Sequence, residues 1–78
     1  MSPKFLDENG YVFKIYSREE PRMHVHIIQG KNNAKCWLEP EIEIAENKGF
    51  RNHQINEILK IVKENEQDFK EKWRKHLG

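Results

Sequence analysis

The chain has 78 residues, of which 36% are hydrophobic and 35% are charged. A chain of this length buries only roughly 60 to 65% of its unfolded surface in one modest core, so we expect residues 1–78 to form a single domain. Fourteen basic and 13 acidic residues give a formal net charge of +1, which indicates neither nucleic-acid nor membrane binding unless charges gather in a local patch.

The first half of the chain alternates between apolar and polar side chains, which is the period of β-strands. After a short extended segment around Phe5, Asn9-Gly10 predicts a tight turn because both residues tolerate positive φ. A polar segment over residues 17–21 is expected to connect the first two of the strands that follow, and Pro40 interrupts the chain before a short last strand. The predicted strands span residues 11–16, 22–29, 34–38 and 42–44.

A helical period replaces this alternation after Gly49. Asn52 is the predicted N-cap, because its side-chain oxygen can accept a hydrogen bond from an amide of the first turn. Helix is expected from about residue 52 to 76, with a polar interruption near residues 64–67 that fits either one bent helix or two helices. The apolar stripe consists of Ile55, Ile58, Leu59, Val62, Phe69 and Trp73.

Alternation gives the predicted sheet two unlike faces. One face has enough apolar area to receive the helical stripe, and it carries Phe13, Ile15, Met23, Val25, Ile27, Cys36 and Leu38. The other face would be left open, and it carries Lys14, Tyr16, His24, His26, Lys35 and Trp37. We therefore predict a two-layer α+β domain, in which a three- to four-stranded antiparallel meander is followed by one long or two shorter C-terminal helices packed on one sheet face.

His24 and His26 are two residues apart in a predicted strand, so their side chains should project from the same face. Imidazole titrates near neutral pH and binds metals and phosphates, which makes this pair the strongest chemical signal in the chain. A zinc site uses three or four ligands, so His53, Glu41 or Glu43 would have to complete one. No known metal-binding spacing is present, and we expect no metal and no cofactor. The pair also fits an ordinary role in cross-strand packing.

The single cysteine, Cys36, cannot form an internal disulfide, and the N-terminus lacks a basic segment followed by an apolar run. No apolar stretch approaches the roughly 20 residues that cross a bilayer. We therefore expect a cytoplasmic protein that does not bind membranes.

Four segments carry a resemblance to a known family: GYVFKIYS at residues 10–17, EPRMHVHI at 20–27, AKCWLEP at 34–40 and GFRNH at 49–53. In order and spacing they resemble the bacterial and archaeal domain of unknown function 4160 family, over nearly the whole chain. The family typically has two prolines before its His-x-His pair, whereas this chain has Pro21 followed by Arg22 and Met23.

The resemblance implies a small, cytoplasmic, single-domain protein to which no biochemical activity is assigned. No catalytic residues come with the family. Its genes are often found beside those of another small uncharacterised family, which implies a two-gene module of the toxin–antitoxin type.

Mixed aromatic and basic surfaces bind macromolecules more often than they catalyse reactions. Our leading hypothesis is a small binding and regulatory module that acts through a partner protein encoded by a neighbouring gene, in a toxin–antitoxin-like pair. Net charge does not indicate nucleic acid as the partner. The predicted binding residues are Tyr16, His24, His26, Lys35, Trp37 and Arg51.

The alternative is a metal-independent ribonuclease or toxin, and the sequence leaves open whether the protein is an enzyme. One imidazole would take the proton of the 2′-hydroxyl group, a second acid would protonate the leaving oxygen, and a basic side chain would stabilise the phosphorane charge. Arg51 and His53 stand at the predicted helix start, where backbone amides also favour an anion. The catalytic candidates are His24, His26, Arg51 and His53.

Overall fold

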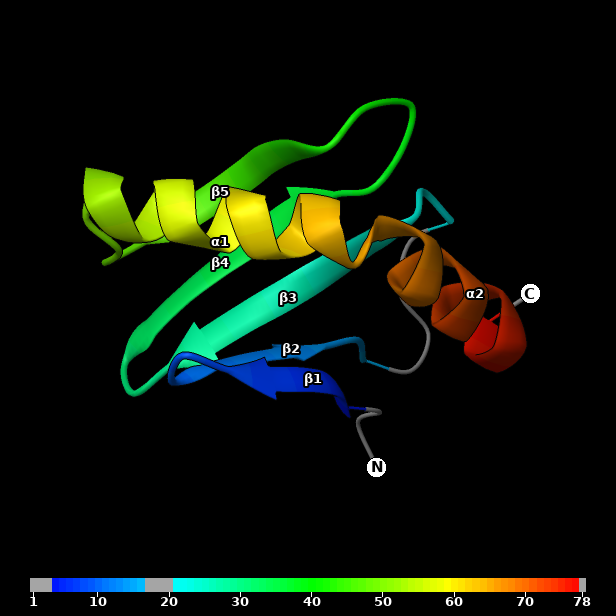
Figure 1. The fold of residues 1–78 in the computed structure, drawn as a ribbon, viewed down its shortest axis with the longest axis horizontal. Helices are drawn as coiled ribbons and strands as arrows, with labels where there is room; N and C mark the ends of the chain where they lie inside the picture. The colour runs from blue at the N-terminus through cyan, green and yellow to red at the C-terminus, as the bar shows by residue number, and fades with distance from the viewer. Residues whose placement is uncertain (1–3, 17–20, 78) are drawn as a thin grey trace.

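The computed structural model describes residues 4–16 and 21–77, so the connection predicted for residues 17–21 lies outside the described residues except for Pro21. The described chain forms an antiparallel meander followed by two helices, as Figure 1 shows. Strands that follow one another in the chain are also neighbours in the sheet. The elements are β1 (Lys4–Glu8), β2 (Tyr11–Lys14), β3 (His24–Gln29), β4 (Asn32–Trp37), β5 (Glu43–Lys48), α1 (Asn52–Glu64) and α2 (Glu66–Leu77).

The predicted α+β class is confirmed, but the described chain forms five strands where three or four were expected. The additional strand is β1, which pairs with β2. A register shift between Lys4 and Leu6 lets both Phe5 and Leu6 pack on the core, so the alternation that marks a strand is lost there. The last strand continues past its predicted end to Lys48, because an edge strand with mostly exposed side chains shows no alternation either.

Positive φ occurs at the predicted Asn9-Gly10 turn and also at Gly49. Asn9 and Gly10, with φ of 54° and 83°, join β1 to β2. Gly49 has a φ of 102°, and a β-carbon at this position would overlap the side chain of Asn32. Glycine is therefore required both by the backbone and by the close approach. The contact fixes the end of β5 against the start of β4 and leads the chain into α1.

The sequence predicted Asn52 as the N-cap of α1, but in the structure the N-cap is Arg51. The Gln54 side-chain oxygen accepts a hydrogen bond from the Arg51 amide at 2.9 Å, so the cap is made from inside the helix. Upstream, the Asn47 side chain donates to the Phe50 carbonyl oxygen at 3.0 Å and accepts from the Phe50 amide at 3.1 Å. Local preference favours asparagine as a cap, but the turn held by Asn47 decides where the helix begins.

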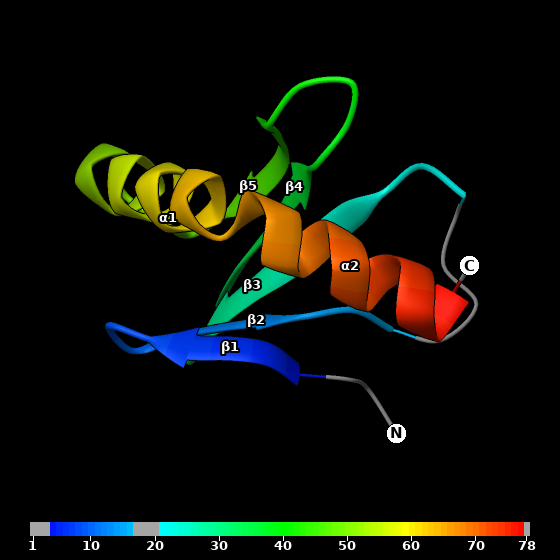
Figure 2. The same ribbon diagram turned by 45° about the vertical axis from the view of Figure 1, so that its right-hand side comes forward.

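The polar interruption separates two helices, which settles the alternative that the sequence left open. The Asn65 side chain donates to the Ile61 carbonyl oxygen at 2.8 Å, and the Asn65 backbone amide donates to the same oxygen at 3.0 Å. A side chain that competes for a helix carbonyl in this way often bends the helix. The chain turns at Asn65, and α1 and α2 then follow different parts of the sheet (Figures 1 and 2).

The core lies between the sheet and the helices, which cover one sheet face. α1 contributes Ile58 and Val62 to this core. α2 contributes Phe69, whose ring centre lies 5.7 Å from that of Phe5 and 5.6 Å from that of Phe13. This contact anchors α2 on β1 and β2. Every residue predicted for the apolar sheet face is buried, namely Phe13, Ile15, Met23, Val25, Ile27, Cys36 and Leu38.

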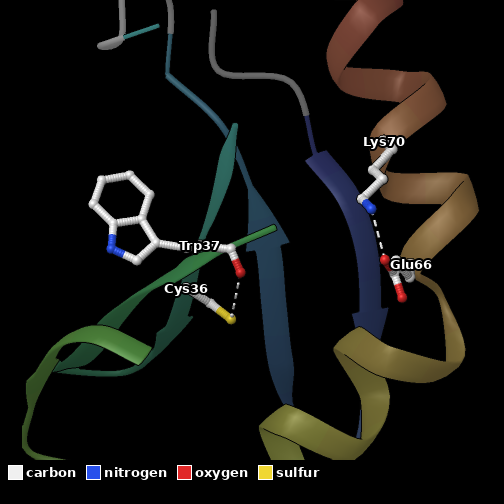
Figure 3. A network of polar contacts seen from close by, with 4 residues as sticks. All are labelled: Cys36, Trp37, Glu66 and Lys70. Atoms are coloured by element: carbon white, nitrogen blue, oxygen red, sulfur yellow. Dashed lines mark hydrogen bonds and ion pairs between the residues drawn. The ribbon is translucent and has the colours of Figure 1, made fainter. Parts of the chain in front are cut away.

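The surface of α2 carries ion pairs one helical turn apart. Lys70 Nζ lies 2.6 Å from Glu66 Oε2, as Figure 3 shows, and Lys72 Nζ lies 2.9 Å from Asp68 Oδ2. Pairs of this kind stabilise a helix by only about 0.2 to 0.5 kcal/mol each, so packing rather than charge holds α2 in place. No helix in the described ranges 4–16 and 21–77 is both long enough and apolar enough to span a bilayer.

Replacing Phe69 by alanine is expected to lower the free energy of unfolding by about 3 to 5 kcal/mol, because removal of a fully buried ring leaves a cavity. Gln67→Ala, at an exposed position of the same helix, is the matched control and should change it by less than about 0.5 kcal/mol. Urea denaturation measures both. Equal midpoints for the two variants would show that Phe69 does not anchor α2.

The pH dependence of stability should report the contact between β2 and α1. Burial raises the pKa of Tyr11 from 10.0 to about 12, with a further contribution from the Glu57 carboxylate, whose Oε1 accepts a hydrogen bond from the Tyr11 hydroxyl group at 2.7 Å. The folded state holds this proton more tightly than the unfolded state. The resulting stabilisation is fully present below about pH 10 and is lost as the pH rises to about 12. Tyr11→Phe should make the fall of the urea midpoint over this range shallower; an unchanged slope would contradict the assignment.

Candidate functional site

The sheet face turned away from α1 and α2, which we term the open sheet face, carries three cross-strand rows of side chains. Directly paired residues of antiparallel strands share a face, so the strand register gives the rows. From β2 to β5, one row is Val12, Ile28, Asn33 and Lys48, and the central row is Lys14, His26, Lys35 and Glu46; from β3 to β5, the third row is His24, Trp37 and Glu43.

Trp37 is half-buried on the open sheet face and contacts two cations. Lys35 Nζ lies 4.4 Å and Arg22 Cζ lies 4.0 Å from the centre of its ring. Arg22 is held in place because its Nε also donates to the Glu39 carbonyl oxygen at 3.0 Å. Figure 3 shows the Trp37 side chain projecting away from the helices, opposite in direction to that of Cys36. Contacts of this kind contribute about 0.5 to 1 kcal/mol each, and they keep positive charge on this face.

Tyr16 follows β2 on the same face, and among the described residues it is the large apolar side chain exposed to solvent, at 38%. The centre of the Tyr16 ring lies 4.7 Å from that of the His26 ring and 5.1 Å from Lys14 Nζ. Tyr16 and His26 therefore form an aromatic pair with a cation beside it. A ring left exposed in such a setting is typical of surfaces that contact another molecule.

A hollow of about 320 Å³ lies beside this aromatic pair. The side chains of Tyr16, His26, Lys35, Glu46 and Lys48 contribute to its lining, together with the turn between β3 and β4. Lys48 Nζ lies 3.5 Å from Glu46 Oε1, but both side chains are more than half exposed. An ion pair this exposed contributes little, so Lys48 can exchange its partner at small cost.

His24 was expected on the open sheet face, but its side chain is fully buried. Its ring centre lies 5.6 Å from Trp37, 5.1 Å from His26 and 5.0 Å from Trp73 of α2. Its Nδ1 lies 2.6 Å from the Arg22 carbonyl oxygen, which can only accept, so this nitrogen carries a proton. The reason is that β3 begins beside α2 (Figure 2), where the Trp73 ring of α2 contacts the His24 ring.

Arg51 and His53 are exposed at the start of α1, apart from the two strand histidines. The start of α1 lies near the end of β3, because the Gln54 side chain donates to Gln29 Oε1 at 3.1 Å. His24 is at the opposite end of β3, five residues and therefore about 16 Å from Gln29. The structure thus brings Tyr16, His26, Lys35 and Trp37 together, buries His24 next to them, and places Arg51 and His53 elsewhere.

The family model described as Domain of unknown function (DUF4160) matches residues 10–74. The chain belongs to this family. The match begins at the turn before β2 and extends into α2, so it includes every row of the open sheet face. No curated protein and no solved structure matched the chain.

The described side chains of this DUF4160 chain bear on two other kinds of chemistry, metal coordination and thiol reactivity. Across residues 4–16 and 21–77, no three histidine, cysteine, aspartate or glutamate residues come together where they could hold a metal ion. Burial raises the pKa of Cys36 to about 12. Its thiol therefore stays protonated at neutral pH and is a poor nucleophile.

The predicted binding residues leave out three charged members of this site: Arg22, Glu46 and Lys48. Glu46 and Lys48 lie beyond the predicted end of the last strand, and a register shift next to Lys35 decides which residues of β5 share its face. No periodicity reports such a shift. Arg22 precedes β3, and its position over Trp37 depends on its hydrogen bond to Glu39 rather than on strand geometry.

The two histidines should differ sharply when each is replaced by alanine. His24→Ala is expected to lower the free energy of unfolding by about 2 kcal/mol or more, because it empties a fully buried site between two tryptophans. His26→Ala removes a half-buried ring at the surface and should lower it by less than about 1 kcal/mol. Chemical denaturation of both variants tests the difference. Equal losses would mean that His24 is not the structural member of the pair.

Proposed function

We propose that this protein is a small binding and regulatory module whose open sheet face docks on a partner protein. The observation that carries the proposal is the cluster of aromatic and cationic side chains that the helices leave uncovered on that face: Arg22 and Lys35 over Trp37, and Tyr16 beside His26. Aromatic residues and arginine are enriched where proteins meet, and they supply most of the binding energy there.

Docking through the face is better supported than docking through a sheet edge. Both edge strands depart from regular pairing, β1 between Lys4 and Leu6 and β5 opposite Lys35 and Cys36. Bulges and charged side chains on edge strands are the usual means by which proteins prevent strand addition. Lys4 and Asp7 on β1 are exposed, as are Glu46 and Lys48 on β5. The partner is therefore expected to cross the face rather than to extend the sheet.

Binding is also better supported than catalysis. Cleavage of RNA without a metal needs two proton-transfer groups that both reach the reacting oxygens. His24 is fully buried against Trp37 and Trp73, and His53 is on α1, near the opposite end of β3. Of the four catalytic candidates, His26 alone lies within the cluster of the open sheet face, so the ribonuclease alternative has less support than docking.

The partner we propose is the product of the neighbouring gene in a two-gene, toxin–antitoxin-like module. This choice of partner rests on the gene order of the family. We place the pair in the cytoplasm, because a single thiol that is buried and protonated suits a reducing compartment. The surface chemistry agrees with a protein partner, since the open sheet face carries acidic as well as basic side chains, with Glu46 opposite Lys35, and protein interfaces match charges of both signs.

The test is to replace Tyr16 and His26 together by alanine. This double variant should weaken capture of the purified neighbouring gene product by about tenfold or more, because truncating central interface aromatics commonly costs about 2 kcal/mol. Trp37 is left intact because it also covers His24. Isothermal titration calorimetry measures the dissociation constants, and the denaturation midpoint shows that the variant is folded.

The matched control is Asn56→Ala with Lys60→Ala, at exposed positions of α1, which should bind as the parent protein does. Unchanged affinity of a folded Tyr16 and His26 double variant would refute docking through the open sheet face. Cleavage of single-stranded RNA by the purified protein, lost in His26→Ala, would instead support the ribonuclease alternative.

A further inference from the structure

The hollow beside Tyr16 has a definite charge pattern that the proposed function does not use. We propose that it binds an extended acidic segment of a partner protein, with carboxylates of the segment meeting Lys35 and Lys48. This inference rests on the proposed function for the identity of the partner, and it adds the chemistry of the segment that the partner presents.

The first support is the spacing of the two lysines. Lys35 and Lys48 lie on adjacent strands and are offset by two residues, because Lys35 pairs with Glu46. With strands about 4.8 Å apart and about 3.3 Å per residue, their α-carbons are about 8 Å apart on one face. Alternate side chains of an extended peptide are about 7 Å apart on one face. Acidic residues at positions i and i+2 of a partner segment therefore match the two cations.

The second support is the condition of the two cations. Lys48 is paired with Glu46 at 3.5 Å, but its side chain is 68% exposed, so the pair resists exchange only weakly. Lys35 is positioned by the Trp37 ring beneath it, which limits the freedom that it loses on binding. One lysine is thus held in place and the other can move to meet the ligand.

The third support is the surroundings of the hollow, which suit a peptide rather than a nucleic acid. Glu46 lines the hollow and Glu43 stands beside Trp37 on the same face. Both carboxylates repel any anion, and a phosphate backbone gives them no hydrogen-bond donor in return. A peptide offers backbone amide donors to Glu46 as well as carboxylates to the lysines. The exposed ring of Tyr16 and the half-buried Ile28 provide apolar contact for the rest of the segment.

The experiment uses three fluorescein-labelled probes of equal length: a seven-residue peptide alternating glutamate and threonine, the same peptide with glutamine for glutamate, and oligouridylate RNA. The glutamate peptide should bind, and its affinity should fall as salt is raised from about 50 to about 500 mM. In nuclear magnetic resonance spectra of the protein, the backbone amide shifts that change on adding this peptide should concentrate at Tyr16, Lys35 and Lys48. Binding of the glutamine peptide with equal affinity, or tighter binding of the RNA, would overturn the inference.

The decisive variant is Lys35→Gln with Lys48→Gln, which should weaken binding of the glutamate peptide about fivefold or more. Lys60→Gln with Lys75→Gln removes two exposed lysines from the helices and is the matched control, for which no change is expected. Equal losses in the two double variants would show that net charge rather than the hollow attracts the peptide, and would refute the site.

Failure of this inference is distinguishable from failure of the proposed function. If the Tyr16 and His26 double variant loses the neighbouring gene product while the Lys35 and Lys48 double variant keeps it, the face docks a partner but the segment is not acidic. If the glutamate peptide binds at the hollow while the gene product does not bind at all, the acidic site stands and the proposed partner is wrong.

Discussion

The structure depends on one constraint: the apolar surface of the two helices is large enough to cover only one face of the sheet. A five-stranded sheet within the described chain has two faces, and the stripe that includes Ile58, Val62 and Phe69 can cover only one of them. The described residues form only these two layers, so the second face is left to solvent in this structure. The open sheet face is suited to this exposure by side chains that are apolar along their length and polar at their tips. The Lys35 ammonium group over the Trp37 ring and the Tyr16 ring beside His26 cover the strands and remain in contact with solvent.

The sequence predicted most of this division because it depends on local patterns. Period-two alternation assigned the buried residues of β2, β3 and β4 to the correct faces, although it did not predict that His24 would be buried, and the helical period assigned Phe69 and Trp73 to the core. Features that do not show in the periodicity were not predicted, even where their contacts are local. The register shift beside Phe5 hid β1, the turn held by Asn47 moved the helix start from Asn52 to Arg51, and the hydrogen bond of the Asn65 side chain to Ile61 marks the break between the two helices.

For the candidate site too, strand alternation predicted which residues share a face but not the contacts between separate elements. Alternation placed Tyr16, His26, Lys35 and Trp37 on one face, and the structure brings them together. It did not reveal that Trp73 would bury His24 from the side, because that contact joins residues 49 positions apart in the chain. Nor did it identify Glu46 and Lys48, whose face depends on a register shift. Proximity along a strand is therefore a reliable guide to a shared face and a poor guide to shared exposure.

Trp37 connects the two regions that the histidines occupy. Its ring contacts the cationic groups of Arg22 and Lys35 and also the buried His24, which in turn contacts Trp73 of α2. Arg22 and Lys35 thus rest on a series of edge-to-face ring contacts that reaches the helix layer, rather than on flexible stems alone. A surface supported in this way loses less conformational entropy when it binds, because its charged groups are already positioned. The burial of His24, which weakens the case for catalysis, is for this reason part of what suits the open sheet face to docking.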